Sequence, residues 1–185
     1  DQPTVAVTAD NQTITYGSVL PTWTYTLGSA VNGDNVSQIF ASPSVTIGGP
    51  TSTGGHATVG THTLTSTGTS SSQLGYAVGT VNNGTLTVNA KSITTPLVVN
   101  NKAYDGTTGA TFSASANGAI TGDLVAIGGT ATFDTKQVGT GKPVSITGLT
   151  LTGADAGNYT LPSATDSSTA DITAKGVTVS GLTAA

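Results

Sequence analysis

The sequence contains no cysteine, methionine, arginine or glutamate, and only 8% of its 185 residues are charged. Without cysteine, no disulfide framework holds the fold together. The five basic residues are scattered lysines and the formal net charge is −4, so the chain lacks the basic patch that nucleic-acid binding requires. No run of about 18 apolar residues occurs, which argues against membrane insertion. No signal peptide is recognisable at the N-terminus, and we expect a piece of a longer chain.

The residues that are abundant favour strands and turns. Hydrophobic residues make up 36% of the chain and are placed at intervals, with threonine, serine, glycine and asparagine between them. Threonine is β-branched and suits strands, whereas glycine and asparagine suit turns. This composition predicts an all-β fold with many short strands rather than a disordered chain.

One internal repeat suggests the domain boundaries. Residues 87–94 (TVNAKSIT) recur as residues 171–178 (DITAKGVT), and each copy reads as a strand, an Ala-Lys pair and a second strand. We therefore predict modules at 1–90 and 91–175, with 176–185 beginning a following repeat. The join near residue 90 has no glycine, proline or serine run of the kind that makes a flexible linker, so we expect the modules to be arranged end to end.

Three local patterns in the first module carry predictions. Aromatic and apolar residues alternate over 23–27, as in a strand. Asn82-Asn83-Gly84 separates two strand-like stretches, and Asn-Gly is the strongest short signal for a hairpin. Residues 33–40 fit either a single helical turn capped by Asp34 or a bulged loop.

The second module contains seven short alternating stretches, which suit an immunoglobulin-like β-sandwich. These stretches are 93–99, 110–116, 123–128, 130–134, 143–152, 158–163 and 169–174. The alternation changes phase at Thr147-Gly148, and a pattern of period two cannot skip a residue without reversing its faces. We therefore expect a β-bulge at Gly148.

The segment Asp155-Ala156-Gly157-Asn158-Tyr159 has the spacing of an immunoglobulin-type tyrosine corner. In that arrangement Tyr159 is buried and its hydroxyl bonds to backbone. Asp155 is expected to brace the turn, and Gly157 to supply an unusual backbone angle.

These residues carry a family resemblance. Lys102-Ala103-Tyr104-Asp105-Gly106-Thr107, followed by Gly153 to Tyr159, resembles the YDG repeat of filamentous-haemagglutinin-like bacterial adhesins. Thr15-Tyr16-Gly17, Val31-Asn32-Gly33-Asp34 and residues 83–88 are similar to the MBG domain of the YGX type, with a departure at Leu74-Gly75-Tyr76. The resemblance implies a sandwich or β-grasp-like first module and a surface-exposed repeat array without catalytic residues. The structural motif residues that it assigns are Tyr104, Asp105, Gly106, Asp155, Gly157 and Tyr159.

The remaining chemistry in the sequence is sparse. A hydrolase needs a nucleophile with a nearby base, and the only histidines are His56, in a glycine-rich loop, and His62, in a strand pattern. We predict no enzyme, no catalytic residues, no resident cofactor and no transition-metal site. Calcium is a weaker alternative, because aspartate is the only acidic residue and no Asp-x-Asp-x-Asp loop occurs. An isopeptide crosslink from Lys91 or Lys102 is a further alternative.

Together these observations predict a structural stalk of a secreted or bacterial cell-surface adhesin. Such a stalk spaces a distal binding region from the cell and supports attachment or biofilm formation, and its partners are the neighbouring repeats of the same chain. The alternative is a module that binds host or matrix glycans directly through Tyr16, Trp23 and Tyr25. An exposed cluster that includes Trp23 and Tyr25 favours that alternative, whereas burial of both favours the stalk. Homotypic contact between stalks through strand edges is a third possibility.

Overall fold

The computed structural model describes residues 2–31, 33–40, 44–67 and 74–181, so Asn32 and residues 182–185 of the expected following repeat lie outside it. Two compact units are present: unit 1 comprises Asp1–Lys91 with Ile120–Asp123, and unit 2 comprises Ser92–Ala119 with Leu124–Ala185. Strands dominate both units, which confirms the predicted all-β class. No helical element of the described residues is long and apolar enough to cross a membrane.

Unit 1 is built from two mixed sheets, whose strand orders are β3-β1-β6 and β2-β7-β5-β4. The strands are β1 (Thr4–Ala9), β2 (Gln12–Thr15), β3 (Tyr25–Leu27), β4 (Ser44–Ile47), β5 (Gly60–Thr67), β6 (Ala77–Asn82) and β7 (Gly84–Asn89). A short 3₁₀ turn, η1 (Val36–Gln38), precedes β4. Its cap is Asn35, whose side chain accepts a bond from the Ser37 N–H, so the expected capping by Asp34 is wrong.

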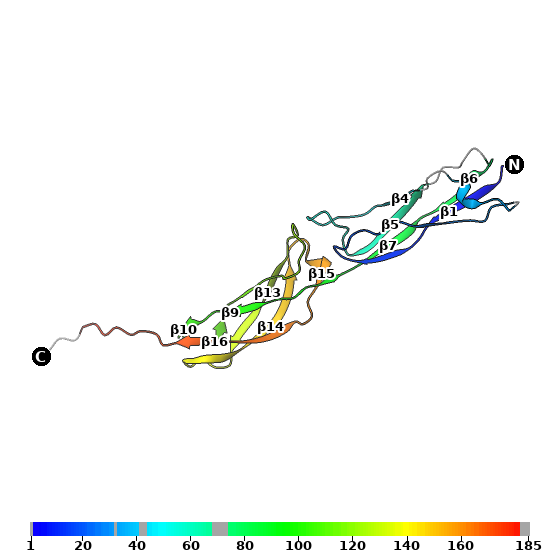
Figure 1. The fold of residues 1–185 in the computed structure, drawn as a ribbon. Helices are drawn as coiled ribbons and strands as arrows, with labels where there is room; N and C mark the ends of the chain where they lie inside the picture. Colours follow the sequence, from blue (N-terminus) through cyan, green and yellow to red (C-terminus); the bar gives the residue numbers. More distant parts are fainter. Residues whose placement is uncertain (1, 32, 41–43, 68–73, 182–185) are drawn as a thin grey trace. The chain divides into compact units, whose positions relative to one another are not determined.

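The predicted hairpin at Asn82-Asn83-Gly84 is also wrong. β6 and β7 lie in different sheets: β6 pairs in parallel with β1, and β7 pairs in parallel with β2 (Figure 1). The chain therefore passes from one sheet to the other at Asn83. Gly84 is needed there for close approach, because a Cβ at this position would collide with the Ala9 carbonyl oxygen.

The described core of the first sheet is small. It consists of Val5, Val7, Ile39, Phe40 and Tyr76, each at most 6% exposed. Strand β1 contributes Val5 and Val7 to this core, because side chains alternate between the two faces of a strand and every second residue of β1 is buried. In the second sheet, Leu64 and Leu86 are fully buried by the same alternation along β5 and β7.

Unit 2 consists mainly of a five-stranded sheet of order β10-β16-β14-β13-β11, with the pair β12-β9 beside it and a further pair, β15-β8. The strands are β8 (Lys91–Ser92), β9 (Leu97–Val99), β10 (Lys102–Ala103), β11 (Gly109–Ala110), β12 (Phe112–Ala114), β13 (Ala126–Phe133), β14 (Gly139–Thr152), β15 (Tyr159–Thr160) and β16 (Thr165–Thr173). The predicted stretches 123–128 and 130–134 thus belong to one strand, β13. Val99 of β9 shares one core with Phe133, Ile146 and Ile172 of the larger sheet.

The bulge expected at Gly148 is confirmed. Gly128 pairs with Thr150 but Thr130 pairs with Thr147, so β14 contains one extra residue at this point. Gly148 has a φ of +65°, which is typical of a bulge that begins with a left-handed glycine. The extra residue reverses the phase of the alternation, and as a result Leu149 is buried on the same side as Ile146.

We predict that Gly148→Ala destabilises unit 2 by about 1–2 kcal/mol, because a residue with a Cβ is strained in the left-handed region. A Cβ at Gly148 would meet no atom within 4 Å, so the loss reports the backbone angle alone. Urea denaturation followed by circular dichroism measures it. The matched control is Gly109→Ala, a strand glycine with open space around it and no positive φ. Equal midpoints for the two variants would contradict the role given to the bulge.

Candidate functional site

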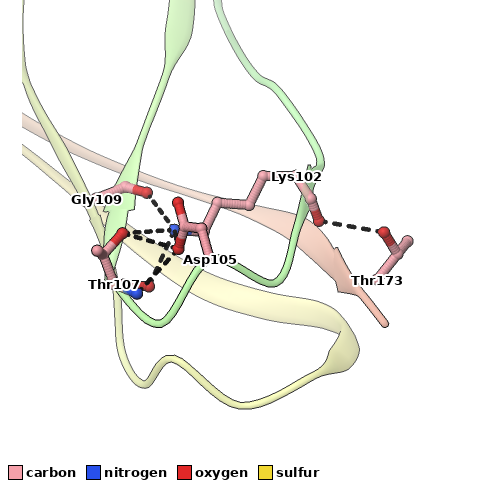
Figure 2. Close-up of polar contacts among 5 residues, drawn as sticks. All are labelled: Lys102, Asp105, Thr107, Gly109 and Thr173. Carbon is pink, nitrogen blue, oxygen red and sulfur yellow. Dashed lines mark hydrogen bonds and ion pairs between the residues drawn. The ribbon is translucent and has the colours of Figure 1, made fainter. Parts of the chain in front are cut away.

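The most densely bonded polar cluster in the described part of unit 2 surrounds the Lys102 ammonium (Figure 2). Its Nζ donates to the Asp105 carboxylate at 2.9 Å, to the Thr107 carbonyl at 2.9 Å and to the Gly109 carbonyl at 2.7 Å. The Nζ also lies 5.6 Å from the centre of the Phe133 ring, within the range of a cation–π interaction. The three N–H bonds of an ammonium are all used in holding this loop.

Asp105 fixes the same loop from its other side. One carboxylate oxygen accepts bonds from the Thr107 N–H, the Thr107 hydroxyl and Lys102. The Thr107 backbone bond, followed by the bonds from Lys102 and from the Thr107 hydroxyl, lowers the pKa of Asp105 from 3.8 to about 2. Gly106 has a φ of +80°, and Tyr104 packs half-buried against the unit 2 core. The Tyr-Asp-Gly motif is therefore a turn held by its own side chains.

An isopeptide bond between Lys102 and Asp105 is disfavoured by this geometry. Amide formation needs a neutral amine and a protonated carboxyl group, which lose water as the bond forms. The lowered pKa of Asp105 keeps its carboxyl group ionised, in the form that does not undergo this reaction.

The expected tyrosine corner is found in altered form. Tyr159 is buried at 5% exposure, as predicted; the bonding of its hydroxyl to backbone stays a prediction. Asp155 precedes the 3₁₀ turn η2 (Ala156–Asn158) without a side-chain cap, and its carboxylate instead accepts the Leu124 N–H at 2.8 Å. Gly157 does not have a positive φ, so that expectation is wrong. The special angle belongs to Gly153, at +107°.

Sequence reasoning missed a second tyrosine anchor, in unit 1. Tyr76 is 2% exposed, and its hydroxyl accepts the Val31 N–H at 3.1 Å. The hydroxyl oxygen also lies 2.9 Å from the Val31 carbonyl and 2.8 Å from the Asp34 carboxylate. Burial, together with the bond to Asp34, raises the pKa of Tyr76. The local signal in the sequence is Gly75, the glycine that precedes Tyr76. In the structure it has a φ of +69°, as a residue at the start of a corner can have.

The three aromatic residues expected as possible ligand contacts do not share one environment. Tyr16 is 1% exposed and Tyr25 is 37% exposed, while Trp23 is half-buried and precedes β3. Tyr25 lies opposite the buried Ala9 on the neighbouring strand. The three side chains therefore do not form one exposed stacking surface.

The histidines do not assemble a catalytic or metal site with the other described residues. His62 is buried, and its two ring nitrogens lie 3.1 Å from the Gly48 carbonyl and 2.7 Å from the Thr58 carbonyl. Its side chain borders a cavity of about 130 Å³ lined by Leu20, Ile47 and Pro50, among others. Among the described residues, no group of three or more His, Cys, Asp or Glu side chains is placed to hold a metal ion.

We predict that Asp105→Asn lowers the stability of unit 2 at neutral pH. Because folding lowers the pKa of Asp105 to about 2, the carboxylate stabilises the fold above about pH 4. That stability is lost as the pH falls from about 4 toward 2. The difference in melting temperature between the wild type and the variant therefore shrinks across this window. The control is Asp166→Asn, at an exposed carboxylate that bonds to the adjacent Ser167 N–H. A difference that stays constant from pH 7 to pH 2 would refute the assignment.

We predict that Tyr76→Phe destabilises unit 1, because it removes the buried hydroxyl that bonds to the Val31 N–H and to the Asp34 carboxylate. Amide hydrogen exchange checks this, with faster exchange expected at Val31 and in the core strand β1. Tyr25→Phe removes the same hydroxyl from a more exposed ring and is the matched control. Similar exchange in the two variants would mean that Tyr76 is not an anchor.

Comparison with known families accounts for most of the chain. The model of the MBG domain (YGX type) matches residues 5–87, and the model of the YDG domain matches residues 87–169. No significant match was found among curated proteins or among solved structures. Domains of these two kinds are non-catalytic and occur in repeat regions of bacterial surface proteins of the adhesin type. The chain is thus an MBG domain of the YGX type followed by a YDG domain.

Proposed function

We propose that the two domains form part of the structural stalk of a secreted or cell-surface adhesin, where they space a distal binding region from the cell. The observation that carries this proposal is the path of the chain through unit 1. Its first two strands run parallel to its last two, with Thr4 of β1 beside Ala77 of β6 at one end and Thr15 of β2 beside Asn89 of β7 at the other. The chain therefore enters unit 1 at one end and leaves at the opposite end, as a linear array of repeats requires.

The use of the signature residues supports the same proposal. Lys102, Asp105 and Thr107 bond to one another and to nearby backbone rather than presenting free groups to a ligand. Ala90 alone separates β7 from β8, so the join offers no flexible linker. A stiff join suits a spacer, because the length of a rod grows in proportion to the number of repeats, while that of a coil grows only as its square root.

Direct binding of host or matrix glycans is the second candidate. Tyr25 favours it, since this aromatic side chain is 37% exposed, and the next residue of its strand, Thr26, donates a hydrogen bond to the Asp10 carboxylate. Tyr25→Ala distinguishes the two functions on a glycan array. Binding that is present in the wild type and lost in this variant favours the glycan-binding module, whereas no binding by either protein favours the stalk.

We predict that small-angle X-ray scattering gives a radius of gyration well above about 16 Å, the value for one compact globule of this length. The physical reason is the join near Ala90, which has no glycine, proline or serine run of the kind that makes a flexible linker. A variant with Gly-Ser-Gly-Ser inserted after Ala90 is the control, and its scattering is expected to show a broader distribution of dimensions. A compact particle near 16 Å would refute the stalk.

A further inference from the structure

Unit 1 includes a short segment from far along the sequence. Ile120–Asp123 belongs to this unit although about thirty residues separate it from Lys91. The segment is a tight turn in which the Asp123 N–H donates to the Ile120 carbonyl at 3.1 Å. Gly122 has a φ of +97°, a left-handed angle that glycine adopts readily. The turn presents the Asp123 carboxylate to the rest of unit 1.

Several donors of unit 1 converge on that carboxylate. The Tyr16 hydroxyl donates to one oxygen at 2.6 Å. The Ser52 hydroxyl and the Gly54 N–H donate to the other oxygen, each at 3.2 Å. Hydrogen bonds to an ionised acceptor are about twice as strong as neutral ones, so the set is well suited to a carboxylate.

The donors are also held in place by contacts that do not involve Asp123. Ser52 accepts the His56 N–H on its hydroxyl oxygen at 3.3 Å, which leaves its own proton free to point at Asp123. The Ser52 N–H in turn donates to the His56 carbonyl at 2.8 Å, closing the loop. Tyr16 is 1% exposed and Ser52 is 9% exposed, and the Tyr16 ring meets His56 edge-on. Burial and these bonds restrict both hydroxyl groups to few orientations.

Two glycines shape the surface around the segment. A Cβ at Gly54 would lie 2.5 Å from the Asp123 carboxylate, and a Cβ at Gly17 would collide with the Ile120 side chain. The Thr53 hydroxyl donates to the Gly122 carbonyl at 2.9 Å. The loop at 52–54 and the Tyr16-Gly17 pair therefore fit both the carboxylate and the backbone of the turn.

We propose that the Tyr-Gly motif of the YGX-type domain is part of a carboxylate-binding site, and that its ligand is an aspartate at the tip of a glycine-containing turn. In this chain the ligand is Asp123, which lies in the range matched by the YDG domain. The site recognises two features of this turn: the carboxylate, which the donors bind, and an apolar residue, Ile120, next to Gly17. This inference goes beyond the proposed stalk, because it gives the Tyr-Gly motif of unit 1 a binding role and a ligand of stated chemistry.

The experiment is a double-mutant cycle in the full chain, with Tyr16→Phe and Asp123→Ala singly and together. The readout is hydrogen exchange at the Gly54 amide, which is expected to become at least about tenfold faster in Asp123→Ala, the equivalent of one charge-assisted bond. Non-additive losses of unit 1 stability are expected in the double variant, because the two groups bond directly. An unchanged Gly54 amide, or strictly additive losses, would overturn the proposal.

Two controls keep the result specific. Asp166→Ala removes an exposed carboxylate of unit 2 and is expected to leave Gly54 unchanged. The Tyr104 amide, which bonds to the Thr173 carbonyl in unit 2, reports whether the rest of the chain stays folded. Should Asp123→Ala unfold unit 1 entirely while Tyr104 stays protected, the proposal is supported, and Asp123→Asn gives the graded readout. Failure of this site leaves the scattering result for the stalk unaffected, so the two outcomes are separable.

Discussion

Hydrogen bonding of the loop backbone is the constraint on which both units depend, because the described cores are small and many segments connect short strands. Aspartate meets this constraint repeatedly. Asp105 accepts the Thr107 N–H, Asp155 accepts the Leu124 N–H and Asp171 accepts the Gly141 N–H. Each bond satisfies a donor that no strand pairing reaches. In these three places an acidic side chain acts as part of the backbone framework.

The same constraint explains the bonding partners of the lysines Lys102 and Lys142 in a chain with so few charges. Lys102 and Lys142 each form an ion pair with an aspartate at 2.9 Å, and the lysine side chain is the less exposed partner in both. Exposed ion pairs contribute little to stability by themselves. What distinguishes Lys102 is the number of oxygens around it, since the two carbonyl bonds fix the path of the loop as well as its charge.

The sequence pattern predicted the features that depend only on neighbouring residues, and it did not predict the pairing of distant segments. The bulge at Gly148 followed from a phase change that any strand with one buried face must correct, and the pairing of β13 with β14 confirms it. The strand exchange at Asn83 could not be predicted in the same way, because Asn-Gly signals a turn but does not say which sheet receives the next strand. The close approach at Gly84 and Gly153 was not predicted for a related reason: each glycine meets a backbone carbonyl from a segment distant in sequence, that of Ala9 or Leu124.

The parallel pairing in unit 1 also bears on how the proposed stalk would respond to tension. Because the first two strands pair with the last two and run in the same direction, a pull on the two ends of the unit would slide the paired strands along one another. The bonds between them then share the load, instead of opening one after another as in a hairpin pulled from its open end. β1 and β2 pair with β6 and β7 along almost their full length. In unit 2 a shorter parallel pair, β10 with β16, includes the last described strand. In the proposed stalk, we expect such a repeat to resist extension through its backbone bonds, which requires neither a large core nor a disulfide.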